Sequence, residues 1–141
     1  MFHSYPLGSI FIFSILAPVV AVLVSSAPVN AFEFSGVWST DAELCSRVFF
    51  RKDNQVEFAE LSDLYGSGFI VDGTRIKGKA AHCTIESRKQ DGDSLKIFAA
   101  CATSIMNQNV EFHLKVVDDD NVVRSFPDIP GMSVKYSRCK V

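Results

Sequence analysis

Closely spaced cysteines are missing from this chain of 141 residues, in which no two of the four cysteines are closer than 18 positions. Zinc sites usually contain at least one tight cysteine pair, so we expect neither a metal nor another cofactor. A strong net charge is also missing, because 14 Lys and Arg against 16 Asp and Glu leave −2 at pH 7. A nearly neutral surface of mixed sign does not indicate a nucleic acid or an anionic membrane as the partner.

Sustained helical periodicity is absent as well, and residues 32–141 contain no repeat, linker or low-complexity segment. Short alternating runs between turn signals take its place. In the clearest run, 110–116, apolar residues alternate with Glu111, His113 and Lys115, which is the period of a half-buried strand. We therefore expect an all-β domain of seven to nine short strands, joined as an antiparallel meander. Closure into a small up-and-down β-barrel would remove its exposed edges.

The first 31 residues predict a signal peptide, although they contain no Lys or Arg. Residues 10–24 are almost wholly apolar, and Val29 with Ala31 supplies the small residues that signal peptidase requires. We expect cleavage after Ala31, export to the periplasm or the extracellular space, and a single mature domain at 32–141 outside the membrane. Ala27 is a second candidate cleavage site. The alternative interpretation is an uncleaved membrane anchor over 10–32.

The cysteines predict two disulfides, because an even count behind an export signal is typical of oxidised domains. Residues 83 and 101 are symmetric about Gly92 in the turn 90–94. An antiparallel hairpin centred there sets Cys83 opposite Cys101, within disulfide range. Cys45 and Cys139 then remain to tie the start of the domain to its end, although four cysteines allow three connectivities and the other pairings stay open.

The residues that catalysis uses do not assemble into a predicted active site. His82 and His113 occupy outward positions of predicted strands and are interpreted as solvated surface residues. The carboxylates at Asp91 and Asp93, and those of the run 118–120, fit turns. Oxidised cysteines supply no thiolate nucleophile. The sequence therefore predicts a protein that is not an enzyme.

The opening of the predicted domain carries a resemblance. Gly36, Val37 and Trp38, preceded by Phe34, resemble the Gly-x-Trp signature of the first strand in lipocalin-like (calycin) barrels. The same element followed by Cys45 is similar to the opening of small bacterial barrels that inhibit secreted metalloproteases. The resemblance implies that Trp38 closes one end of the barrel and that the partner is a hydrolase.

A second resemblance lies in the glycine-containing segment 61–69. Ser67 and Gly68, with the Lys-Gly turn at 77–78, resemble the loops that bacterial inhibitors of c-type lysozyme insert into the lysozyme cleft. That family has a Tyr closely after the Ser-Gly pair, whereas this chain has Phe69 and Ile70. The predicted partner-binding residues are Tyr65, Gly66, Ser67, Gly68, Phe69 and Lys77. The alternative is that Tyr65 and its neighbour Leu64 belong to the core.

Together these patterns predict an exported inhibitor of a hydrolase such as c-type lysozyme or a secreted protease, acting as a monomer or a homodimer. In this hypothesis Ser67 hydrogen-bonds catalytic carboxylates, Lys77 adds a charged contact, and Tyr65 or Phe69 anchors the loop. The rigid loop 127–132 either covers a barrel end or forms a binding rim.

Two other functions remain open. The first is a lipocalin-like carrier of a small apolar ligand, with a cavity lined by residues such as Ile97, Phe112 and Leu114. The second is an envelope structural protein whose partner is another protein or peptidoglycan.

Overall fold

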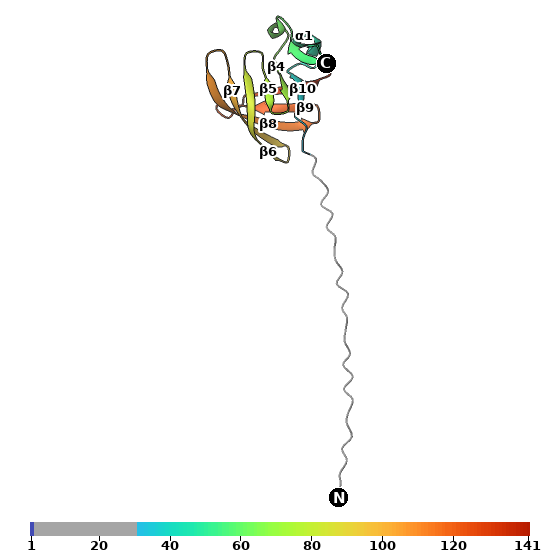
Figure 1. Cartoon of the computed structure of the whole chain (residues 1–141), viewed down its shortest axis with the longest axis vertical. Helices are drawn as coiled ribbons and strands as arrows, with labels where there is room; N and C mark the ends of the chain where they lie inside the picture. The colour runs from blue at the N-terminus through green and yellow to red at the C-terminus, as the bar shows by residue number, and fades with distance from the viewer. Residues whose placement is uncertain (2–30) are drawn as a thin grey trace.

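The computed structural model describes Met1 and residues 31–141, so residues 2–30 of the predicted signal peptide lie outside the described part. The domain is a closed antiparallel barrel of eight strands, in the order β1, β4, β5, β6, β7, β8, β9, β10 and back to β1 (Figure 1). The predicted up-and-down β-barrel is confirmed. The barrel strands are β1 (Gly36–Ser39), β4 (Gly68–Asp72), β5 (Arg75–Lys77), β6 (His82–Asp91), β7 (Ser94–Ala102), β8 (Asn107–Asp118), β9 (Asn121–Ser125) and β10 (Ser133–Cys139).

Alternation along the strands builds the core inside the barrel. In β7, Leu95, Ile97 and Ala99 are fully buried, and exposed residues separate them. These side chains meet Trp38 and Val122 from other strands in one apolar cluster. Because one strand face is buried and the other solvated, the period of two predicts the inward face correctly.

The β6–β7 hairpin pairs Cys83 with Cys101, as predicted, and the two form a disulfide. The turn, however, is a two-residue loop at 92–93 that pairs Asp91 with Ser94, not a turn centred on Gly92. A β-bulge between Ile85 and Ser87 takes up the extra residue and restores the predicted register at the disulfide.

An insertion at 40–67 joins β1 to β4 and covers the outside of the barrel. It contains α1 (Cys45–Val48), the hairpin of β2 (Phe49–Lys52) and β3 (Gln55–Phe58), and η1 (Ser62–Leu64). The helix α1 begins at Cys45, and no side chain caps it. The turn between β2 and β3 consists of Asp53 and Asn54, both at positive φ.

The insertion packs on the outer face of β1 and β10 through a second apolar cluster that includes Val37, Val48 and Phe49. The disulfide between Cys45 and Cys139 joins α1 to the last strand, so the expected connectivity is confirmed. In Figure 1, α1 and the C-terminus accordingly lie side by side. No helix in the described part of the chain has the length and apolar character needed to cross a membrane.

Candidate functional site

The two ends of the barrel differ in how they are sealed. At the closed end, where the turns 73–74, 92–93 and 119–120 lie, the N-terminal segment 32–35 folds over the barrel. Phe32 and Phe34 are buried there against Trp38, with ring centroids 5.9–6.5 Å apart. The indole Nε1 of Trp38 donates a hydrogen bond to the Phe34 carbonyl at 3.0 Å. An aromatic plug therefore fills this end.

Arg138 of β10 completes the plug from the opposite side. Its guanidinium carbon lies 4.3 Å from the Trp38 ring centroid, and its Nη atoms donate to the carbonyls of Ser35 at 2.6 Å and Glu33 at 2.7 Å. A Cβ on Gly36 would lie 2.5 Å from Arg138 Nη1, so a side chain at Gly36 would collide with the guanidinium. The Gly-x-Trp spacing thus has a local physical reason in this chain.

The open end is formed by the loops 78–81, 103–106 and 126–132, together with the end of the insertion near Ser67. In Figure 1 the loops that follow β5 and β7 lie at the upper left, at the other end of the barrel from the β6–β7 turn at the bottom. An ion pair of 2.6 Å between Lys79 Nζ and Asp63 links the insertion to the first loop. The open end carries no plug comparable to Trp38 among the described residues, and a cavity begins there.

This cavity has a volume of about 290 Å³ and reaches into the barrel from the open end. Phe112, Leu114 and Tyr136 form its walls, the Cys83–Cys101 disulfide borders it, and Ser67, Gly78 and Thr103 lie at its mouth. Ligand pockets usually enclose ~300–1,000 Å³, so this one suits a small molecule. Phe112 and Leu114 were expected in such a cavity, whereas Ile97, the partner of Phe112 on β7, is fully buried and does not line it. The complete lining comprises Phe34, Ser67, Gly68, Phe69, Ile76, Gly78, Ala81, Cys83, Cys101, Thr103, Gln108, Val110, Phe112, Leu114, Arg124 and Tyr136.

Arg124 is the one charged side chain in this lining. Its guanidinium lies between two rings, with its carbon 4.5 Å from the centroids of both Phe112 and Phe126. Burial lowers the pKa of Arg124 below its ordinary value, and the neighbouring Tyr136 partly offsets this effect. Arg124 is not among the site residues predicted from the sequence.

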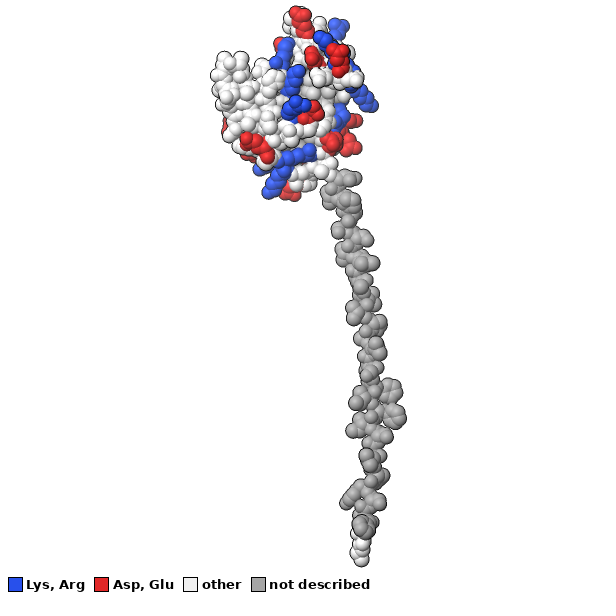
Figure 2. Space-filling view, in the orientation of Figure 1, with Lys and Arg blue, Asp and Glu red and all other residues white. Residues whose placement is uncertain are grey.

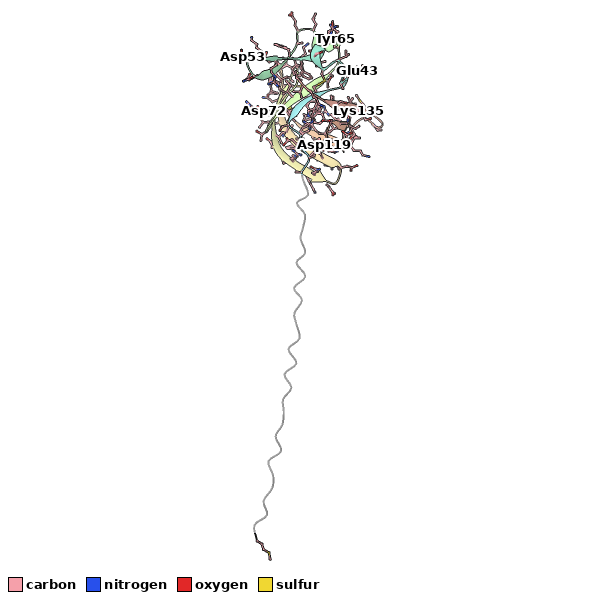
Figure 3. All side chains as sticks on the ribbon, turned by 90° about the vertical axis from the view of Figure 1, so that its right-hand side faces the viewer. Glu43, Asp53, Tyr65, Asp72, Asp119 and Lys135 are labelled. Carbon is pink, nitrogen blue, oxygen red and sulfur yellow. A yellow bond between two sulfur atoms is a disulfide. The ribbon has the colours of Figure 1, made fainter. Side chains whose placement is uncertain are left out.

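The predicted partner-binding segment 65–69 is only partly presented to solvent. Tyr65 is half-buried in the outer cluster, with Arg47 stacked over its ring at 5.2 Å. Phe69 points into the barrel, where its ring lies 4.9 Å from Tyr136 and 6.3 Å from Trp38. Figure 3 shows Tyr65 at the end of the molecule remote from Asp119. Neither aromatic side chain is therefore free to act as a protruding anchor.

Ser67 is exposed, and hydrogen bonds fix its backbone to Thr40. The Thr40 amide donates to the Ser67 carbonyl at 2.9 Å, and the Ser67 amide donates to Thr40 Oγ1 at 3.1 Å. Gly66 has a φ of 134°, a region that side chains rarely adopt. Ser67 and Gly68 meet Gly78 at the cavity mouth, whereas Lys77 borders a separate depression of about 810 Å³ on the outer wall.

Exposed apolar side chains gather on the loops of the open end. Leu64 is 73% exposed and Ile105 is 90% exposed, and the loop 126–132 adds Ile129 and Met132. In Figure 2 the upper left of the molecule, where Figure 1 draws the loop between β7 and β8, is largely free of charged side chains. The full set of apolar rim residues is Leu61, Leu64, Ile105, Met106, Ile129 and Met132. Exposed apolar side chains that gather at one end of a fold are a feature of binding sites.

The two described histidines lie on the outside of the barrel. His82 is exposed, and His113 Nε2 lies 2.9 Å from Glu111 Oε1 on the outer face of β8. Within 31–141 no group of three or more His, Cys, Asp and Glu side chains is close enough to hold a metal ion. The open end and its cavity are therefore the candidate site.

The comparisons with known proteins leave the chain without an assigned family. No protein-family model matches the sequence, and no curated protein or solved structure matches the chain.

Proposed function

We propose that this protein is an exported, non-enzymatic barrel that binds a small apolar ligand in its cavity. The observation that supports this function best is the contrast between the two ends. Trp38 and Arg138 plug one end, and at the other a cavity of about 290 Å³ opens between Phe112, Leu114 and Tyr136. An apolar pocket with few polar groups is the usual form of a small-molecule site.

The ligand enters through the open end, because the aromatic plug blocks the opposite route. Thr103 and Gln108 offer polar groups near the mouth, and apart from Arg124 the other large side chains of the lining are aromatic or aliphatic. This division suits a ligand whose apolar body is buried in the cavity while one polar end stays close to solvent.

The test is saturable binding of the neutral fluorescent probe N-phenyl-1-naphthylamine to the oxidised protein. Val110 lines the cavity on β8, so Val110→Trp fills it and is expected to weaken probe binding at least tenfold. Val117 lies outward on the same strand and is 56% exposed, so Val117→Trp is the matched control and should bind like the wild type. Absence of saturable fluorescence with the wild type would refute the carrier function.

A second candidate is inhibition of a hydrolase, and the apolar rim of the open end favours it. Leu64 of η1, Ile105 and Ile129 are exposed at the open end, where Ser67 is exposed as well. An inhibitor that enters an enzyme cleft needs such protruding apolar contacts close to a hydrogen-bonding group. In this version the rim residues are the anchors, and Tyr65 and Phe69 hold the loop in place from inside.

Inhibition is measured with c-type lysozyme and with a panel of secreted metalloproteases. We expect sub-micromolar inhibition that falls at least tenfold in Ser67→Arg and in Ile105→Asp. Val117→Asp adds the same charge at the closed end and should leave inhibition unchanged. Gly68 is unsuitable for this test, because a Cβ there would lie 2.3 Å from the Trp38 carbonyl oxygen. Full activity of every enzyme in the panel at micromolar protein would exclude this candidate.

A further inference from the structure

Arg124 faces the barrel interior, which is unusual for a charged side chain. It lies on β9 opposite Leu114 of β8 and Val134 of β10, and it shares its face with the buried Val122. Directly paired residues project from the same side of a sheet, so the register turns Arg124 inward with Leu114. Its side chain therefore reaches the cavity rather than the solvent outside the barrel.

The surroundings of Arg124 leave one direction of approach. Phe112 and Phe126 lie over its guanidinium, each with the ring centroid 4.5 Å from the guanidinium carbon. Cation–π contacts of this kind use the face of the planar group and leave its N–H edges for hydrogen bonds in the plane. A ligand group must then meet the edge, and a flat acceptor with two oxygens fits that geometry.

One atom on this edge has no partner. Nε of Arg124 is buried and makes no hydrogen bond within the described residues, and no salt bridge recorded for 31–141 involves this side chain. An unpartnered buried donor on a charged group costs more free energy than a neutral one. Burial also lowers the pKa of Arg124, but a guanidinium stays protonated at neutral pH. The cavity thus holds a positive charge that lacks its anion.

We propose that the cavity is selective for small amphipathic carboxylates, with Arg124 as the residue that binds the carboxylate. This inference rests on the carrier function proposed above. The two carboxylate oxygens accept hydrogen bonds from Nε and one Nη in the plane between the two phenylalanine rings. The apolar body lies along Leu114 and the Cys83–Cys101 disulfide. At ~30 Å³ for each water-sized volume, the cavity holds a body of about ten non-hydrogen atoms.

The test compares two ligands that share an apolar chain and differ in the head group. Octanoate and 1-octanol are titrated into the oxidised protein by calorimetry or by displacement of N-phenyl-1-naphthylamine. We expect the wild type to bind octanoate at least tenfold more tightly than 1-octanol. Equal or weaker binding of octanoate would overturn the selectivity, and this comparison uses the wild type alone.

Variants of Arg124 then assign the selectivity to this side chain. Arg124→Met keeps the length and removes the charge, so octanoate affinity should fall at least tenfold while 1-octanol binding stays the same or rises. Arg124→Lys keeps a point charge without the planar fork and should recover only part of the loss.

The failures of the two proposals are distinguishable. If the wild type binds neither ligand nor the fluorescent probe, the carrier function fails and the selectivity falls with it. If Arg124→Met retains the full octanoate preference, the carrier function stands and the assignment to Arg124 is wrong.

Discussion

The guanidinium of Arg138 stacks on Trp38, the first strand's fully buried indole, across the seam where the barrel's first and last strands pair. The same guanidinium donates to three backbone carbonyls, those of Glu33, Ser35 and Asp119. Asp120 lies 3.3 Å from its Nε. One side chain thus joins the N-terminal segment, β1 and the β8–β9 turn at the closed end.

Replacing Arg138 by Ala is expected to lower the free energy of unfolding by about 2–4 kcal/mol, because several carbonyls lose a charged donor and Trp38 loses its cover. Arg138→Lys should recover less than half, since an ammonium cannot reach these carbonyls from one plane. Urea unfolding with the disulfides intact measures both variants. Wild-type stability in Arg138→Ala would contradict the role assigned to this residue.

Gly68 is expected to tolerate no side chain. A Cβ at this position would lie 2.3 Å from the Trp38 carbonyl oxygen and 2.7 Å from the Phe49 ring, so backbone would have to move. We expect Gly68→Ala to lower the unfolding free energy by about 1–3 kcal/mol, the usual cost of overpacking. Gly78→Ala is the control, because its nearest contact is 3.4 Å away. Thermal unfolding of the two variants should separate them clearly, and similar midpoints would contradict the steric argument.

Asp118 is expected to make stability depend on acidity. Hydrogen bonds from the Asn121 side chain at 2.8 and 3.0 Å and from the Asp120 amide at 2.9 Å lower its pKa below the ordinary value of 3.8. The stabilisation is therefore full above about pH 5 and is lost as the pH falls through the folded-state pKa. We expect wild type to be more stable than Asp118→Asn at pH 6, with the difference shrinking toward pH 2.

Chemical denaturation across this pH range measures the effect. Asp128→Asn removes the same charge from the loop 126–132 and serves as the control. A gap between wild type and Asp118→Asn that does not change with pH would contradict the ionisation argument.

The two disulfides are expected to contribute unequally. Cys45 and Cys139 close a loop of 94 residues, whereas Cys83 and Cys101 close one of 18. In the chain-entropy model these loops are worth about 4.7 and about 3 kcal/mol. The double variant Cys45→Ala, Cys139→Ala should therefore have the lower urea midpoint of the two double alanine variants. The reverse order would show that loop entropy does not control their stabilities.

Local patterns predicted the barrel because its strands are short, alternate strictly and follow one another through tight turns. The pairing of Cys83 with Cys101 could be counted from the turn, and the disulfide between Cys45 and Cys139 followed by elimination. The first pairing depends on residues close in sequence, where period and turn chemistry are informative, whereas the second joins residues 94 positions apart and followed only from the even cysteine count.

The inward position of Arg124 could not be predicted in this way, because a β-bulge between Val116 and Asp118 shifts the β8–β9 register by one residue. Counting from the pair Asp118 and Asn121 would place Ser125 opposite Leu114 and turn Arg124 outward. A shift of one residue exchanges the two faces of a strand. A charged residue on the inner face of a strand indicates a binding site, but Arg124 can be assigned to that face only when the position of the bulge is known.

The anchoring roles expected of Tyr65 and Phe69 do not agree with their packing, although both residues are apolar and lie beside glycines. Phe69 shares the inner face of β4 with the buried Val71, and its ring lies inside the barrel beside Trp38 and Tyr136. Tyr65 packs on the insertion, which has no periodic pattern long enough to reveal its contacts.

The pairing of β1 with β10 also sets an order of events during folding. β1 has no partner on one side until the last residues of the chain are available, because Val37 pairs with Cys139. The β6–β7 hairpin needs only neighbouring residues, so Cys83 and Cys101 can be oxidised while the rest of the chain is still extended. Cys45 meets Cys139 only after the cylinder closes. The disulfide between them therefore forms after the first and last strands have paired, and we expect oxidation of the chain to proceed from the local link to the distant one.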